Sequence, residues 1–209
     1  NASMNRHFIF NSLNSIQYFI NSSDKLSANR FLTNFAKLIR KNLDSSAANN
    51  FIVTLSEEIE RIELYLSLER MRFSNKFDYT VEVASYLDTE ELEIPSMILQ
   101  PFVENSIIHG VLPLNESRKG LVEVKIYREF GELVFEVTDN GLGIDNSLEG
   151  KSASIEGDHE SKGVDITNRR IDILRKLTGE NLLIVGPFQM EDSDGNALGT
   201  KVILKLGDV

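Results

Sequence analysis

The sequence predicts an α+β fold, in which an N-terminal helical hairpin precedes a two-layer α/β sandwich with a mixed sheet and helices on one face. Apolar residues recur at the period of helices up to about residue 73, and at the period of strands from residue 77. The later segments run strand, helix, strand, strand, long loop, helix, strand and strand. We therefore expect two domains, residues 1–73 and residues 74–209.

Three helices are expected in the N-terminal domain. The first ends at a polar turn, and one of its faces carries apolar residues at helical spacing: Ile9, Leu13, Ile16 and Ile20. The second has apolar positions from residue 28 to residue 43 and is ended by the polar residues 44–50. Thr54 and Glu57 form the pattern of a capping box for the third helix. Its inward face is expected to be Leu55, Ile59, Ile62 and Leu66.

The sandwich is expected to begin with a strand at residues 77–83, where apolar and polar residues alternate. Pro95 then precedes a helix that runs to about Gly110 and is interrupted or restarted at Pro101. Two further strands meet around Gly131.

A long glycine-rich loop is expected after these strands, followed by a helix from about Gly163 to Leu177. Residues 182–185 and 201–206 predict two closing strands.

The composition excludes several classes of function. Lys and Arg number 22 against 32 Asp and Glu, a net charge of −10 that repels nucleic acid and anionic lipid surfaces. The chain has no cysteine, which excludes thiolate metal sites, disulfides and cysteine nucleophiles. No apolar run approaches the length that spans a bilayer, about 20 residues. We therefore expect no direct membrane contact in this part of the protein. Residues 1–3 resemble a cloning remnant, so we expect the chain to be a fragment of a longer protein.

His7 is the first candidate for chemistry. It heads a polar face of the first helix and is flanked by Phe8 and Phe10. Asn11, Asn14 and Tyr18 continue that face at helical spacing. The alternative is an ordinary solvent-facing histidine on a helix.

Glu104 and Asn105 form the second candidate, with His109 four residues beyond Asn105 on the same predicted helix face. An amide oxygen suits Mg²⁺, which prefers oxygen ligands, and the adjacent carboxylate can orient a water or accept a proton. The alternative is the ordinary polar surface of a helix.

Asp139, Gly141 and Gly143 form the third candidate, at the end of a predicted strand. A carboxylate there can accept a hydrogen bond from the exocyclic amine of adenine, and the glycines allow the backbone to approach a ligand closely. The alternative is an ordinary turn.

Gly163 is expected to open a helix whose unpaired amides could seat a phosphate. Basic residues that could assist, or could simply be solvated charges, lie nearby: Lys162, Arg169 and Arg170. Gly199 and Thr200 begin the last strand and read locally as a turn.

These segments, in this order, resemble the LytS/YehU-type bacterial sensor histidine kinases over nearly the whole chain. Residues 5–14 (NRHFIFNSLN) resemble the phosphoacceptor box, and residues 55–73 the helix that follows it. Residues 95–110 (PSMILQPFVENSIIHG) are similar to the N box. The two glycine boxes and the closing strand are matched by residues 139–143, 161–171 and 199–202. Two positions depart from the family pattern, because Arg6 replaces a usual proline and Ile108 a frequent lysine.

The resemblance implies an ATP-binding domain of the GHKL (Bergerat) type. Asn105 would carry Mg²⁺, His109 would contribute to the nucleotide site, and Asp139 would bind the adenine amine. Gly141, Gly143 and Gly163 would bound a mobile lid, and Thr200 would lie near the base.

The resemblance also implies the reaction. His7 would attack the γ-phosphorus of ATP, with Glu104 orienting or deprotonating the ring, and the phosphoryl group would pass to an aspartate of a response-regulator receiver domain. The hairpin would form a homodimer, and the full-length protein would be anchored in the bacterial inner membrane with this part in the cytoplasm. The alternatives are a degenerate kinase that binds nucleotide or dimerises without phosphotransfer, and a GHKL ATPase.

Overall fold

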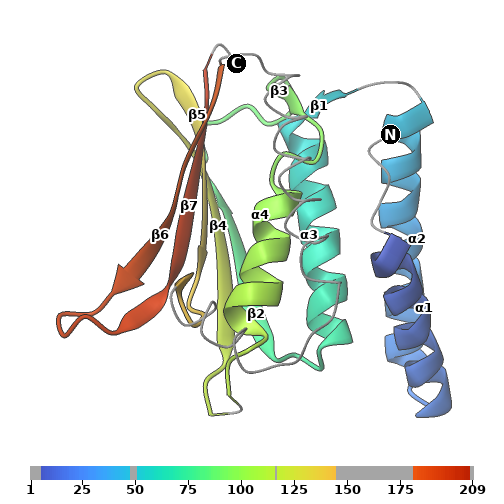
Figure 1. The fold of residues 1–209 in the computed structure, drawn as a ribbon. Coiled ribbons are helices and arrows are strands. Elements are labelled where there is room, and N and C mark those ends of the chain that lie inside the picture. Colours follow the sequence, from blue (N-terminus) through green and yellow to red (C-terminus); the bar gives the residue numbers. More distant parts are fainter. Residues whose placement is uncertain (1–5, 48–50, 116, 145–180, 208–209) are drawn as a thin grey trace.

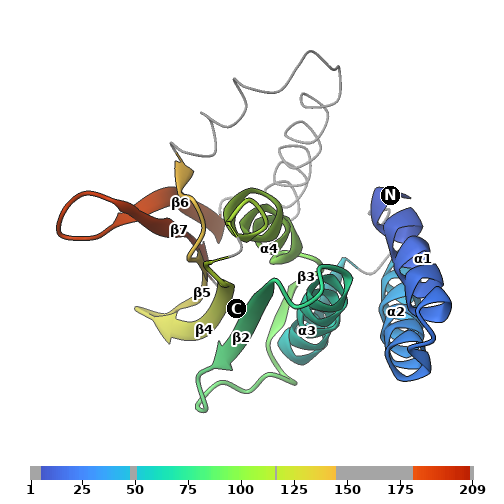
Figure 2. The same cartoon turned by 90° about the horizontal axis from the view of Figure 1, so that it is seen from below.

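The computed structural model describes residues 6–47, 51–115, 117–144 and 181–207 of the chain. In order, its elements are α1 Arg6–Asn21, α2 Lys25–Ala47, β1 Ile52–Thr54, α3 Leu55–Arg72, β2 Phe77–Val83, β3 Glu93–Pro95, α4 Gln100–Asn105, the π-helix η1 Ser106–Val111, β4 Gly120–Glu129, β5 Glu132–Asp139, β6 Leu182–Glu191 and β7 Ala197–Leu206. Both ribbon views place α3 between the α1–α2 hairpin and the main sheet (Figures 1 and 2). Within the described ranges, no helix combines the length and the apolar character that crossing a membrane requires.

The main sheet has five strands in the order β2-β4-β5-β7-β6. β2 pairs with β4 in parallel, whereas the other three pairings are antiparallel, so the sheet is mixed. Helices α3 and α4 lie on the same face of this sheet (Figure 1). The predicted α+β class, with a helical hairpin followed by a two-layer sandwich, is therefore confirmed. A separate two-stranded ribbon pairs β1 with β3.

The hairpin packs through a face of α1 that the sequence does not predict. Phe8 is 5% exposed and its ring lies 5.4 Å from that of Tyr65 on α3, while Ser12 is fully buried. Leu13 and Ile20, from the predicted apolar face, are 50% and 61% exposed. Ile16, from the same face, is partly buried against the core, so the predicted apolar stripe is divided between packed and exposed positions.

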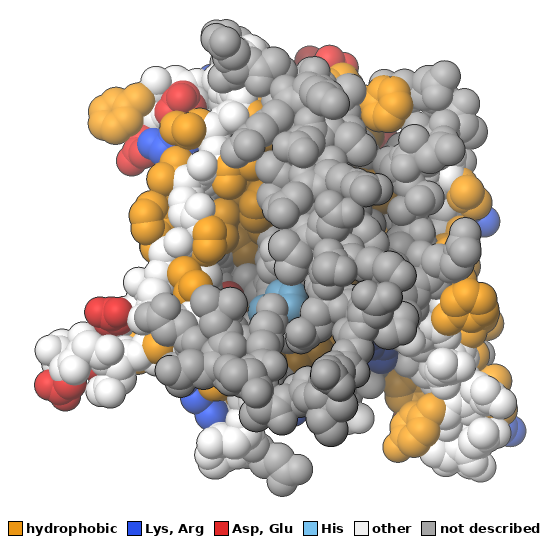
Figure 3. All heavy atoms as spheres, in the orientation of Figure 1, with side chains coloured by type: hydrophobic (Ala, Val, Ile, Leu, Met, Phe, Trp, Pro, Cys, Tyr) orange, Lys and Arg blue, Asp and Glu red, His pale blue; other side chains and the backbone are white. Residues whose placement is uncertain are grey.

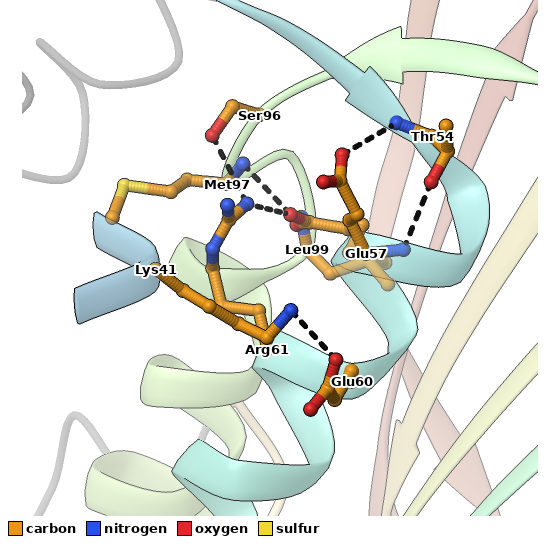
Figure 4. Close-up of polar contacts among 9 residues, drawn as sticks. Lys41, Thr54, Glu57, Glu60, Arg61, Ser96, Met97 and Leu99 are labelled. Atoms are coloured by element: carbon orange, nitrogen blue, oxygen red, sulfur yellow. Dashed lines mark hydrogen bonds and ion pairs between the residues drawn. The ribbon is translucent and has the colours of Figure 1, made fainter. Parts of the chain in front are cut away.

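Helix α3 begins as the sequence predicts. The Thr54 hydroxyl accepts a hydrogen bond from the Glu57 amide at 3.2 Å, and the Thr54 amide donates to Glu57 Oε2 at 3.1 Å, which confirms the capping box (Figure 4). Leu55, Ile62 and Leu66 are buried in the core, as expected for the inward face. Because α3 packs on both the hairpin and the sheet, it connects the two.

The segment after Pro95 differs from its prediction. Pro95 ends the short strand β3, and the helix begins only at Gln100, so that Pro101 lies in its first turn. The chain then widens into the π-helix η1, where the Leu112 amide donates to the Ile107 carbonyl at 3.0 Å, a bond spanning five residues. Local sequence preference does not predict this widening, because it results from packing on β4 and β5.

The strands joined around Gly131 are confirmed as β4 and β5. The closing strands are longer than predicted, and β7 already begins at Ala197. Gly199 and Thr200 therefore lie inside the last strand, as the resemblance to the closing strand implies, although locally they read as a turn. The helix expected from Gly163 to Leu177 lies outside the described residues.

Candidate functional site

Asp139 is the best-defined polar group of the candidate site. It ends β5, is 2% exposed, and its Oδ1 accepts a hydrogen bond from the Gly141 amide at 2.9 Å. Burial raises the pKa of Asp139 above its ordinary value, while hydrogen bonds from the Gly141 amide, the Ser106 hydroxyl and the Thr200 amide oppose that rise. The carboxyl is thus held in place by donors from β7, η1 and its own loop.

Two glycines bring the end of η1 into direct contact with the strand end. A Cβ on Gly141 would lie 2.4 Å from the backbone of Gly110, and a Cβ on Gly110 would lie 2.6 Å from Asp139 Oδ1. Neither position has room for a side chain, since Gly141 faces the backbone of Gly110 and Gly110 faces the buried carboxyl of Asp139. The two backbones therefore meet beside Asp139, and the Leu142 amide donates to the Gly110 carbonyl at 3.3 Å.

A third glycine supports Asp139 from the neighbouring strand. Gly199 has φ +142°, and a Cβ there would lie 1.8 Å from the Asp139 carbonyl oxygen. Thr200 pairs directly with Asp139 across β5 and β7. Beyond the glycine box, Gln189 on β6 accepts a hydrogen bond from the Ile144 amide at 3.1 Å.

The N-box residues lie at the junction of α4 and η1. Glu104 and Asn105 are half-buried there, and Glu104 Oε1 accepts a hydrogen bond from Gln100 Nε2 at 2.8 Å. His109 is exposed on η1. The expectation that Asn105 and His109 share a face assumed α-helical spacing, which η1 does not keep.

Glu69 is a buried acid on α3 that interacts electrostatically with Glu104. The sequence did not identify it as a site residue. Glu69 is 2% exposed and forms an ion pair with Arg72 at 2.9 Å. Burial raises the pKa of Glu69 to about 7; Arg72 lowers it and Glu104 raises it further. No spacing pattern in the sequence could have identified this acid, because its environment comes from α4.

The structure thus brings together three of the predicted residues, Asp139, Gly141 and Thr200. It adds several that were not assigned a role: Ser106, Gly110, Gln189 and Gly199. Gly110, Ser106 and Gly199 could have been suspected from their positions in the N box and the closing strand, whereas Gln189 carries no such signal.

The other predicted residues lie elsewhere. His7 is on the first turn of α1, in the hairpin. Gly143, with φ +80°, continues the loop from Gly141. Gly163 lies outside the described residues. Within the part of the chain that the structure describes, no three His, Asp or Glu side chains form a group that could hold a metal ion.

Comparison with known proteins gives one family. A family model described as histidine kinase matches residues 1–77. The sensor histidine kinase BtsS of Escherichia coli K12 is 34% identical over 139 residues, which are 66% of this chain and 23% of BtsS. The sensor protein LytS of Bacillus anthracis is 28% identical over 211 residues, which are 99% of this chain and 34% of LytS. The chain therefore spans 23% to 34% of the length of these relatives.

Solved structures give weaker similarities. The catalytic domain of histidine kinase ThkA is 16% identical with a TM-score of 0.46, covering 75% of this chain and 94% of that domain. The mycobacterial sensor histidine kinase MprB is 20% identical with a TM-score of 0.45, covering 74% of this chain and 95% of that one. Because both scores are low, the fold described above depends on this chain's own strand order and pairing.

Proposed function

This chain belongs to the histidine kinase family, among the sensor kinases that include LytS and BtsS, and from that premise we propose that it is the kinase core of a two-component sensor. In this proposal ATP phosphorylates His7, residues 1–73 form the acceptor hairpin and the linker helix that follows it, and residues 74–209 bind the nucleotide. The observation that carries the proposal is the buried carboxyl of Asp139, set beside the backbone contact of Gly110 and Gly141.

Adenine recognition by Asp139 is supported by its hydrogen bonds. A carboxylate has about four acceptor positions, and three donors face this one, from Gly141, Ser106 and Thr200. One acceptor position remains for an exocyclic amine such as that of adenine. Guanine has a carbonyl at the same place. Because a carbonyl has no proton to donate, its oxygen would face the buried carboxylate without a hydrogen bond, which costs free energy. The bare backbone at Gly110 and Gly141 suits the close approach of a flat base.

Asn105 is the proposed ligand of Mg²⁺, because its amide offers a neutral oxygen at the end of α4. Among the residues that the structure describes, no carboxylates cluster there, and Mg²⁺ usually keeps several waters and binds nucleotide phosphates. When bound, such an ion neutralises charge on the phosphates during transfer. His109 and Thr200 are proposed to line the same nucleotide site, with Gly143 and Gly163 bounding the lid.

His7 is the proposed nucleophile. The lone pair of a neutral ring nitrogen forms the new bond to the γ-phosphorus while the bond to the leaving oxygen of ADP breaks. The protein then has to supply position and charge neutralisation rather than a strong base. Glu104 is proposed to orient the ring or to accept its second proton.

The partners follow from the same proposal. The phosphoryl group would pass to an aspartate of a response-regulator receiver domain. The hairpin would pair with a second copy, because apolar side chains remain exposed along it (Figure 3). Those exposed by half or more are Phe10, Leu13, Tyr18, Ile20, Leu26, Leu32 and Leu43. In the full-length protein this core would lie in the cytoplasm, with an anchor in the inner membrane.

The test is to incubate the full-length protein with Mg-ATP labelled on the γ-phosphate. Label that is acid-labile, alkali-stable and lost in His7→Ala is the expected result. Nucleotide binding without label would indicate a degenerate kinase, and steady ADP release without label an ATPase; either result contradicts the proposal.

A further inference from the structure

A buried ion pair lies where α3 meets the segment that leads into α4. Glu58 is 1% exposed and Arg61 is 4% exposed, and Arg61 Nη1 lies 2.6 Å from Glu58 Oε2. Burying two charges costs on the order of several kcal/mol per ion unless further hydrogen bonds compensate. The partners of this pair are therefore informative.

Those partners belong to the turn before α4. Glu58 Oε2 accepts a hydrogen bond from the Met97 amide at 3.0 Å, and Oε1 accepts from the Leu99 amide at 3.3 Å. Arg61 Nη1 also donates to the Ser96 hydroxyl at 3.0 Å. Figure 4 shows Arg61 directed at Ser96 and at the carboxylate beside Met97 and Leu99. Two helix side chains thus bind three residues of one turn.

The turn needs such support. Met97 has φ +64°, a conformation that costs a non-glycine residue energy. Leu99 is the N-cap of α4 and makes no capping hydrogen bond with its own side chain. Glu58 therefore satisfies, from a different helix, the amide of the N-cap residue Leu99, a donor that a Glu or Gln at N3 satisfies in a capping box, together with the amide of Met97.

The turn determines where the end of α4 lies. The helix is six residues long and carries Glu104 and Asn105 at its C-terminal end. Because the helix is so short, a rotation or translation of its first turn also moves its last turn.

Helix α3 also contacts the hairpin that bears His7. Lys41 on α2 lies 2.6 Å from Glu60, and Phe8 packs on Tyr65 with ring centroids 5.4 Å apart. Glu58 therefore stands on the helix that touches both the acceptor hairpin and the N-box helix.

We infer that Glu58 and Arg61 form a clamp that positions Glu104 and Asn105 for phosphoryl transfer, with Glu58 as a positioning residue and Arg61 as its counter-charge. The inference rests on the proposed function. It predicts that an acceptor oxygen at position 58 matters to transfer independently of the charge.

Two double variants separate these effects. The amide double variant, Glu58→Gln with Arg61→Met, removes both charges but keeps one acceptor oxygen, enough for one of the two turn amides. The leucine double variant, Glu58→Leu with Arg61→Met, has a similar volume and removes the oxygen as well. Because neither leaves a buried unpaired charge, both are expected to fold. Glu57→Ala is the matched control, since it removes the capping box of α3 and Glu57 bonds to Thr54 rather than to the turn.

Initial rates of γ-phosphate incorporation into His7 are measured in the full-length protein at saturating Mg-ATP, at a temperature where urea unfolding shows each variant to be folded. The amide double variant and Glu57→Ala should stay within about threefold of wild type, and the leucine double variant should fall at least tenfold below it. Amide exchange should accelerate at both Met97 and Leu99 in the leucine double variant, and at no more than one of them in the amide double variant.

Equal rates in the two double variants would overturn the inference and leave the proposed function standing. So would a loss in Glu57→Ala as large as in the leucine double variant, because the effect would then follow helix stability. A wild-type protein that takes no label on His7 would overturn the proposed function, and the inference with it.

Discussion

At the scale of single residues, the proposed adenine site depends on Asp139, a buried carboxyl with one acceptor position left for the adenine amine. We expect Asp139→Asn to lower the affinity for ATP at least tenfold, because an amide in that place presents a donor or a weaker acceptor to the adenine amine. The fold should persist, since the amide oxygen can still accept from Gly141. Calorimetric titration with a non-hydrolysable ATP analogue, with circular dichroism as the check on folding, measures this. Unchanged affinity would remove Asp139 from the site.

Gly141 offers a second residue-scale prediction. Gly141→Ala would place a methyl group 2.4 Å from the backbone of Gly110, which cannot rotate away. We expect the free energy of unfolding to fall by about 1–3 kcal/mol, the usual cost of overpacking, and nucleotide binding to weaken with it. Gly195→Ala is the comparison on stability, because a Cβ at Gly195 meets no atom within 4 Å, although its positive φ carries a small cost of its own. Equal losses in the two variants would show that the close contact is unimportant.

Glu69 gives a pH prediction. Its pKa is raised from 4.5 to about 7, mainly by burial, so the native protein binds the extra proton between those values. Stability is therefore lost as pH rises through this window. Glu69→Gln should remove about 2–3 kcal/mol of the difference in unfolding free energy between pH 5 and pH 8. Urea unfolding at both pH values measures it, with Glu63→Gln, at an exposed position of the same helix, as control. Identical pH dependence in wild type and Glu69→Gln would contradict the assignment.

At the scale of elements, α1 shows where periodicity informs and where it misleads. The apolar stripe was visible in the sequence, yet in the single chain only part of it is covered. Phe8 and Ser12 are buried, Ile16 is partly buried, and Leu13 and Ile20 stay exposed. An amphipathic pattern identifies an apolar face but not the surface that covers it. A stripe left exposed in one chain is what a second copy would bury.

We therefore expect Leu13→Ser with Ile20→Ser to shift the protein from dimer toward monomer. The folded chain should lose little stability, because these side chains are 50% and 61% exposed. Sedimentation velocity across a concentration series measures the shift. Phe130→Ser is the control, since Phe130 is 95% exposed on the turn between β4 and β5, away from the hairpin. A dimer that survives the double substitution would place the interface elsewhere.

Local chemistry decided which elements could be predicted. The capping box of α3 and the strands β2, β4 and β5 were predictable because neighbouring residues determine them. The late start of α4, the π-helix and the early start of β7 were not, because each depends on contacts far along the chain. Gly199, for example, reads locally as a turn residue and is instead the glycine that Asp139 requires on the adjacent strand.

At the scale of the whole molecule, the fold class and the order of the motifs were predictable, and the meeting of Gly110 with Gly141 was not. That contact joins the N box to the glycine box, which no local pattern encodes. Helix α3 connects the parts of the molecule. It packs on the hairpin and on the sheet, and its Glu58 binds the turn before α4.

The central claim is that a nucleotide bound at Asp139 phosphorylates His7. The most direct measurement is to map the phosphoryl group by mass spectrometry, under fragmentation that preserves phosphohistidine, after the full-length protein has reacted with Mg-ATP. We expect phosphate on His7 in wild type and a strong reduction in Asp139→Asn. Phosphate on another residue, or equal phosphorylation of His7 in both proteins, would contradict the account.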